Sequence, residues 1–371
     1  YSKAEPLYLR ALAIREKVLE AEHPSTAISL NNLASLYNKQ GQYSKAIPYY
    51  LRVLAIREKV LGAEHPRTAI SINNLGLLYE YQGLYNKAEP LYLRALAIKE
   101  KVLGAEHPET ATSLNNLSVL YYKQGLYNKA QPLSLRALAI REKVLGAEHP
   151  RTAISLNNLA SLYQDQGLYN KAEPLKVRAL AIREKELGAE HPETAISLNN
   201  LASLYQEQGL YNKAETLYKR ALAIYEKVLG AEHPSTANTL NNLGMLIEGQ
   251  GLKQEPLLVR ALAITEKVLG AEHPRTAISL NNLALLYEYQ GLYNKAEPLI
   301  RRALDIRLIV IQRQAPYLAL SDRQSFVSSL GTAFQIAFSS AARGDSGAEL
   351  AMFSRLNRQG LLEEIEKRQA Q

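Results

Sequence analysis

The sequence contains no cysteine and no tryptophan, and phenylalanine occurs only four times in 371 residues. Without cysteine, the chain forms no disulfide and offers neither a thiolate nucleophile nor a thiolate metal ligand. No apolar run approaches the roughly 18 residues that a bilayer-spanning helix needs, and no secretory signal is visible. We therefore expect a cytoplasmic protein without a membrane segment.

Acidic residues are in moderate deficit, which gives a formal net charge of +8 and an isoelectric point near 9.3. A basic chain raises nucleic-acid binding as an alternative. However, the Lys and Arg residues are interleaved with Glu throughout, and no run of them is longer than the pair Arg301-Arg302. We therefore expect a mildly basic scaffold with no nucleic-acid partner.

What the chain does contain is a repeat marked by its seven histidines, each of which lies in the tetrapeptide Ala-Glu-His-Pro. Successive histidines are 42 residues apart five times and then 40 residues apart. A fixed period in this range indicates stacked supersecondary units, each of which contacts only its neighbours. Such stacks form extended binding surfaces, so the repeat favours a binding protein over an enzyme. The histidines are His23, His65, His107, His149, His191, His233 and His273.

Each unit has the pattern of two helices joined by a short turn. In the first complete unit, Pro24 suits the first turn of a helix, and His23 is its expected N-cap. Apolar residues follow at a helical spacing, and Gly41 is expected to end this helix in a left-handed conformation. The second helix is predicted to run from near Tyr43 to just before Gly62. The predicted fold class is therefore an all-α solenoid.

The two ends of the chain depart from this pattern. Residues 1–19 read as a second helix whose first helix is missing, so we expect the sequence to be part of a longer protein. The apolar end that this leaves at Tyr1 suggests weak end-to-end self-association. We predict a solenoid over residues 1–311, made of this helix and seven repeats, and C-terminal capping helices over residues 312–371, which hold all four phenylalanines.

The repeat resembles the tetratricopeptide signature, stretched to 42 residues by a longer second helix. The matching pattern is Leu33-Ala34-x-x-Tyr37-x-x-x-Gly41-x-Tyr43-x-x-Ala46-x-x-x-Tyr50. Strings such as Arg-Ala-Leu-Ala-Ile-Arg-Glu-Lys-Val-Leu-Gly are similar to the kinesin light chain subfamily, over residues 1 to about 308. The resemblance implies a right-handed superhelix whose concave groove binds peptides. The near-identical units look most like bacterial, particularly cyanobacterial, members, so cargo transport is not implied.

A second, shorter resemblance lies near the C-terminus. Residues 350–362 resemble the spacer before a caspase-like peptidase domain in cyanobacterial tetratricopeptide proteins. This resemblance implies an alternative function, in which the chain is the regulatory or sensor arm of a larger protein that carries the peptidase downstream.

Comparison of the units predicts where a ligand would bind. On a helical wheel of the first helix, the side opposite the apolar stripe varies from unit to unit except at one asparagine. An amide offers both a donor and an acceptor, so a row of asparagines can bind the backbone of an extended peptide. The resemblance also implies that asparagine at this position holds a ligand's carboxylate or backbone. The asparagines are Asn32, Asn74, Asn116, Asn158, Asn200, Asn242 and Asn282.

Variable residues beside these asparagines are predicted to select the peptide sequence. Ile70, Leu77 and Ile154 would take apolar side chains, and cations would attract acidic ones. The remaining predicted peptide-binding residues are Arg67, Tyr81, Lys123 and Arg151.

A second constant asparagine, Asn31 and its counterparts up to Asn281, lies nearer the helix interface. A buried asparagine there more often bonds a neighbouring loop carbonyl than a ligand. The constancy of both asparagines can also record recent duplication of the repeat. One sequence leaves these alternatives open.

The sequence gives little support to a metal site, to catalysis or to an adhesion motif. Equivalent histidines of successive units should lie on the order of 10 Å apart, the packing distance of helices, whereas zinc ligands lie about 2 Å from the ion. We expect no metal site and no cofactor. The chain has no Gly-rich phosphate loop and no nucleophile–base pair, so we do not expect an enzyme. Arg343-Gly344-Asp345 matches an adhesion tripeptide, but a turn explains it better.

The sixth repeat is irregular. Its linker from Gly251 to Pro256 is two residues shorter than in the sister repeats and lacks the usual Tyr and Ala. We expect the start of its second helix to be shortened and less well packed.

Overall fold

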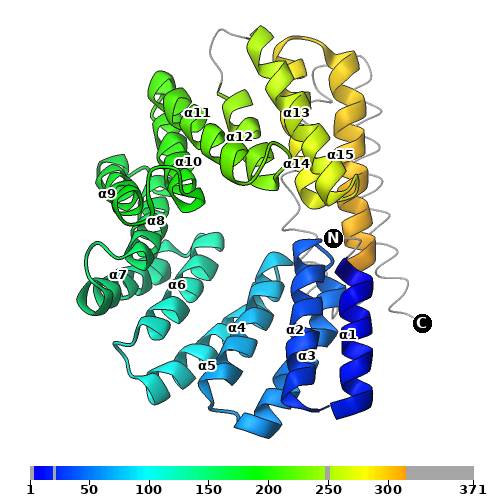
Figure 1. The fold of residues 1–371 in the computed structure, drawn as a ribbon. Helices are drawn as coiled ribbons and strands as arrows, with labels where there is room; N and C mark the ends of the chain where they lie inside the picture. The colour runs from blue at the N-terminus through cyan, green and yellow to red at the C-terminus, as the bar shows by residue number, and fades with distance from the viewer. Residues whose placement is uncertain (1–3, 20–21, 247–250, 315–371) are drawn as a thin grey trace. The chain divides into compact units, whose positions relative to one another are not determined.

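The computed structural model describes residues 4–19, 22–246 and 251–314, and these ranges form fifteen α-helices without a strand (Figure 1). The predicted capping helices after residue 314, the phenylalanines and the Arg-Gly-Asp sequence lie outside the described residues. The helices are α1 (Ala4–Leu19), α2 (Pro24–Lys39), α3 (Tyr43–Leu61), α4 (Pro66–Tyr81), α5 (Tyr85–Leu103), α6 (Pro108–Lys123), α7 (Tyr127–Leu145), α8 (Pro150–Asp165), α9 (Tyr169–Leu187), α10 (Pro192–Glu207), α11 (Tyr211–Val228), α12 (Pro234–Gly244), α13 (Gly251–Leu269), α14 (Pro274–Tyr289) and α15 (Tyr293–Gln314).

The helices pair as the repeat predicts, and the described chain is an all-α solenoid. First helices such as α2, α4, α6 and α8 have 16 residues, and second helices such as α3, α5, α7 and α9 have 19. Each of these first helices packs on the second helix of its own repeat and on the one before it. By its contacts the chain divides into two compact units, Tyr1–Leu204 and Tyr205–Gln371, which we call unit 1 and unit 2.

In unit 1 the helices form two layers. The first helices lie along the inner side of the curved row, and the second helices lie along the outer side (Figure 1). In the described part of the chain, no helix is long and apolar enough to cross a membrane.

Histidine and glycine set the ends of the helices. In all seven repeats the His Nδ1 accepts a hydrogen bond of 3.0 to 3.1 Å from the backbone N–H two residues further on. This bond satisfies one of the donors that a helix leaves free at its N-terminus, and it confirms the capping role predicted for His23. Gly41 follows α2 with a φ of 70°, and Gly62 follows α3 with a φ of 97°, values that favour glycine.

The core of each repeat is formed by apolar positions that recur from repeat to repeat. Leu30 and Leu33 of α2 are fully buried, and Ala46 and Tyr50 of α3 are buried against them. Leu36 of the same helix is also buried in this cluster. The layered packing leaves the opposite side of each first helix available.

The sixth repeat differs from its prediction. The second helix α13 keeps 19 residues, whereas the first helix α12 has only 11 and ends at Gly244. Leu258 packs so closely on Gly244 that a Cβ there would lie 2.6 Å from it, and this contact fixes the position of α13. The shortened element is therefore α12 and not α13, and Gln254 Nε2 of α13 donates to the carbonyl of Leu246 after α12 at 2.8 Å.

Candidate functional site: a basic pocket on the first helices

The predicted row of asparagines lies on the accessible side of the first helices. Asn32 is exposed, and its counterparts in the other repeats are half-buried. The amides also form contacts within the protein: Asn116 Nδ2 donates to Asn73 Oδ1 of the preceding repeat at 2.8 Å. The row thus couples neighbouring repeats and still presents polar atoms to solvent.

The other constant asparagine lies between repeats. Asn115, Asn157 and Asn241 are buried, and each amide donates to a serine hydroxyl on the next first helix, at 3.0, 3.3 and 2.8 Å. The interface position expected for this asparagine is therefore correct, but its partner is a serine side chain, not a loop carbonyl.

In the third repeat a buried arginine lies where α7 meets the next first helix, a contact that we call a joint between repeats, and this arginine was not predicted as a site residue. Arg141 of α7 is only 3% exposed. Its guanidinium donates to the carbonyl of Arg151 at 3.0 Å, to Ser155 Oγ at 2.9 Å and to Thr112 Oγ1 at 3.3 Å. On the sequence alone, the position of the equivalent Arg57 near the end of its helix indicates only that it complements the helix dipole. The string Ile-Arg-Glu-Lys recurs in α3, α7 and α9, with Ile-Lys-Glu-Lys in α5, and its cation lies ten residues before the first turn of the next helix. This recurrence is the signal that could have indicated the role of the cation.

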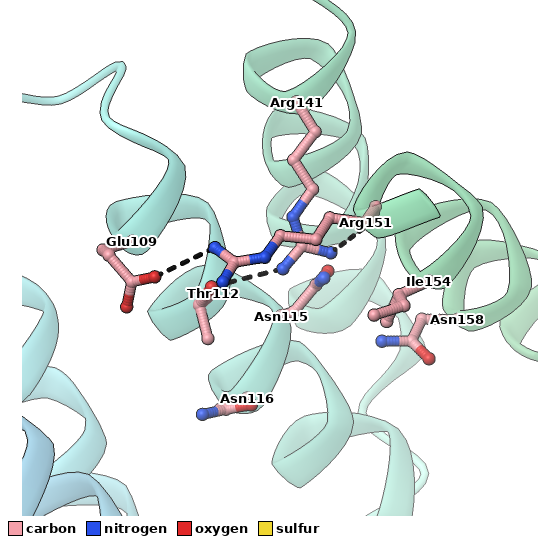
Figure 2. Close-up of a pocket in the computed structure, with 8 residues that line it drawn as sticks. All are labelled: Glu109, Thr112, Asn115, Asn116, Arg141, Arg151, Ile154 and Asn158. Carbon is pink, nitrogen blue, oxygen red and sulfur yellow. Dashed lines mark hydrogen bonds and ion pairs between the residues drawn. The ribbon is translucent and has the colours of Figure 1, made fainter. Parts of the chain in front are cut away.

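These groups meet in a cavity of about 290 Å³ in unit 1 (Figure 2). Its lining comes from α6, α7 and α8, with the two guanidinium groups of Arg141 and Arg151 side by side above Thr112 and Asn115. Four of the predicted peptide-binding residues belong to the lining: Asn116, Asn158, Arg151 and Ile154. The four others are Glu109, Thr112, Asn115 and Arg141.

The pocket carries an excess of positive charge. Glu109 Oε1 lies 3.1 Å from Arg151 Nη1, and its other oxygen lies 3.4 Å from Lys99 Nζ. Burial raises the pKa of Glu109, but Lys99 and Arg151 together lower it below its usual value. A single carboxylate therefore serves two cations, and Arg141 has no carboxylate of its own among the described residues.

Two buried polar atoms of the pocket residues lack a partner. Burial and the charge of Arg151 lower the pKa of Arg141 to about 10, so its guanidinium stays protonated near neutrality. Its Nε and the Oδ1 of Asn115 are buried without a hydrogen bond to any described residue. Unpaired buried polar atoms are uncommon in folded proteins, and the Oδ1 atoms of the equivalent Asn157 and Asn241 share this state.

The remaining predicted residues do not line this pocket. Lys123 is 2.7 Å from Glu80 and lies over the ring of Tyr81, 5.4 Å from its centroid. Tyr81 in turn stacks on Tyr43 with ring centroids 5.7 Å apart. These residues form a separate cluster at the C-terminal ends of α4 and α6. Its cation is already paired, which weakens the predicted attraction of Lys123 for acidic side chains.

The two other predicted apolar residues, together with Arg67, lie on α4. Ile70 is 43% exposed, Leu77 is half-buried and Arg67 is exposed. Within the described ranges, no group of His, Asp or Glu side chains is arranged to hold a metal ion.

Comparison with known families identifies the repeat. The tetratricopeptide repeat model matches residues 1–59, 30–101, 67–143, 109–185, 151–227, 193–255 and 255–308. The chain belongs to the tetratricopeptide repeat family. None of the curated proteins matches it in sequence.

Comparison with solved structures identifies the type of tetratricopeptide repeat. A putative kinesin light chain from Podosopora anserina, with nearly identical repeats, is 33% identical over 56% of this chain and 98% of its own, with a TM-score of 0.46. At this identity the repeats are kinesin light chain-like. The Rap conjugation gene regulator of plasmid pLS20 is 16% identical over 78% of this chain and 75% of its own, with a TM-score of 0.59. The quorum sensor NprR from B. thuringiensis is 16% identical over 82% of this chain and 83% of its own, with a TM-score of 0.58. The last two share the fold.

Proposed function

We propose that this chain is a non-catalytic scaffold that binds an extended peptide segment of another protein along its first helices. The observation that carries the proposal is the pocket of unit 1, where Asn116 and Asn158 flank two guanidinium groups. The asparagine amides would bind the peptide backbone, and the excess positive charge would take an acidic side chain. A related fold, the regulator of plasmid pLS20, was solved in complex with the Phr* peptide, which supports a peptide as the ligand class.

The proposal includes a cytoplasmic location and excludes a nucleic-acid partner. A nucleic-acid ligand would need a row of exposed cations, whereas the pocket offers amides and an isoleucine besides its charges. Weak end-to-end self-association is a separate prediction, which sedimentation at several concentrations tests.

The test is capture from a peptide library. The chain is compared with the double variant Asn116→Ala, Asn158→Ala, and we expect the variant to lose most of the captured peptides. A matched control is Asn128→Ala, Asn170→Ala, which removes two exposed asparagines at the starts of α7 and α9, away from the pocket. Equal capture by the wild type and the Asn116/Asn158 variant would contradict the role of the asparagine row.

The second candidate is a regulatory arm of a larger protein with a downstream caspase-like peptidase. The short resemblance over residues 350–362 favours it. It requires a Cys–His peptidase domain after residue 371 of the native protein, which sequencing of the complete reading frame tests.

A further inference from the structure

Each second helix of unit 1 from α3 to α9 brings one cation to the first turn of the next first helix. The cation donates to the carbonyl of the residue after the helix-starting proline, at distances from 2.9 to 3.2 Å. The charge is thus held at one fixed place in every joint between repeats. The four cations are Arg57, Lys99, Arg141 and Arg183.

The side chain at that first turn decides whether the cation is neutralised. Lys99 Nζ lies 3.4 Å from Glu109 Oε2, and Arg183 Nη2 lies 2.9 Å from Glu193 Oε2. In the other two joints the same position is an arginine, because Arg57 meets Arg67 and Arg141 meets Arg151. The row therefore alternates between joints with an excess of positive charge and neutralised joints. Arg57 and Arg67 have no ion pair to a carboxylate among the described residues, and of Arg141 and Arg151 only Arg151 has one, to the Glu109 that it shares with Lys99. We call these two joints with excess charge uncompensated.

The uncompensated joints are strained electrostatically. Burial and the neighbouring Arg67 lower the pKa of Arg57, and burial and Arg151 do the same to Arg141. A buried charge without a counter-ion is costly, and a carboxylate supplied from outside removes that cost by charge-assisted hydrogen bonds. Each uncompensated joint is thus complementary to one acidic group of a ligand.

The distance between the two joints sets the spacing of the acidic groups. Neighbouring helices pack 8–10 Å apart, so joints two repeats apart are separated by roughly 20 Å. An extended chain advances about 3.3 Å per residue, so this distance corresponds to about six residues.

We propose that unit 1 selects peptides with two acidic clusters about six residues apart, one bound at Arg57 and Arg67 and the other at Arg141 and Arg151. This inference rests on the proposed peptide-binding function and adds the pattern that the ligand must carry. The first-turn residue is its specificity determinant, because arginine there opens an acidic site and glutamate closes it.

The probes are fluorescein-labelled peptides of alanine and serine that carry two Asp-Asp pairs whose centres are three, six or nine residues apart, or a single pair. Binding is followed by fluorescence anisotropy at low ionic strength. We expect the six-residue spacing to bind at least about tenfold more tightly than the single pair, because the second contact becomes intramolecular. The three- and nine-residue spacings should bind like the single pair.

The variants are Arg67→Glu and Arg151→Glu, which copy the residues that the chain itself has at Glu109 and Glu193. Each single variant should reduce the affinity for the peptide with the six-residue spacing to that of the single pair, and the double variant should abolish binding. Arg275→Glu, the same position in a repeat of unit 2, is the matched control and should change nothing. Thermal melts followed by circular dichroism check that the variants are folded.

Three outcomes would overturn the inference. They are equal affinity for all spacings, unchanged binding by the double variant, and no binding of any probe. If library capture still depends on Asn116 and Asn158 while spaced acidic pairs gain nothing, the acidic pattern is wrong and the proposed function stands. If capture is also independent of these asparagines, both are wrong.

Discussion

His107 illustrates how the same residue type can suggest one chemistry and perform another. Seven histidines in equal positions invite a metal site, yet His107 Nδ1 accepts a hydrogen bond from the N–H of Glu109 at 3.1 Å. The imidazole serves as an acceptor, which requires that this nitrogen be unprotonated. The sequence predicts this role correctly, because proline at the next position marks the start of a helix.

Stability at mildly acidic pH should depend on His233. Burial and the nearby Arg275 lower the pKa of His233 below its usual value of about 6.5. The folded state thus favours the neutral form, so the stabilisation is present above about pH 6.5 and is lost as the pH falls through the lowered pKa. The variant His233→Asn keeps a capping acceptor without this titration. We expect urea unfolding of the variant to lose less stability than the wild type between about pH 6.5 and 5, and equal losses would contradict the assignment.

Arg141 should contribute to binding more than to stability. Because its charge is buried without its own carboxylate, replacement by a side chain of similar length removes a desolvation cost along with three hydrogen bonds. We expect Arg141→Met to change the free energy of unfolding by no more than about 1 kcal/mol and to reduce the affinity for the peptide with the six-residue spacing to that of the single pair. Arg136→Met on the same helix removes an exposed ion pair to Glu100 and should leave binding intact. A large loss of stability in Arg141→Met would indicate a structural role.

At the scale of the helices, the sequence predicts the repeat almost completely. Proline and glycine mark where each helix starts and ends, and the apolar spacing gives the buried side. The sixth repeat was predicted wrongly because the position of a deletion is decided by packing. Leu258 fills the space beside Gly244, and this contact keeps α13 in place while α12 loses its last turns.

Restoring the missing residues should lengthen α12. We would replace Lys253-Gln254 with the Tyr-Asn-Lys-Ala of the sister repeats. With a linker of normal length, α12 should regain the 16 residues of its counterparts, and its added backbone hydrogen bonds should protect more amides. Hydrogen exchange of residues 241–246 should slow, and unchanged exchange would contradict this explanation. A similar replacement that keeps the short length, with Tyr-Ala in place of Lys-Gln, is the control.

The site was less predictable than the helices. The helical wheel correctly placed Asn116 and Asn158 on the accessible side, since that needs only the pattern of one helix. Arg141 was missed because its partners are Arg151 and Ser155 of the next repeat, and a contact across a joint cannot be read from one helix. The alternation of arginine and glutamate at the first turn gains meaning only once that contact is known.

In the whole molecule, stability should be distributed locally, as in other stacked repeats. Leu114 is fully buried in the third repeat, so Leu114→Ala should cost about 2–5 kcal/mol. We expect hydrogen exchange to accelerate mainly in α6, α7 and the helices that contact them, and much less in α2. Leu135→Ala, at a position 43% exposed, is the control and should have little effect. Uniform acceleration over unit 1 would instead indicate a single cooperative unit.

The hydroxyl of Ser155 connects the packing of the repeats with the pocket. It accepts hydrogen bonds from both Asn115 and Arg141, one belonging to the stacking of the repeats and the other to the pocket. A ligand that draws Arg141 toward itself would therefore also strain the contact between α6 and α8. The stiffness of unit 1 would then depend on whether its pocket is occupied.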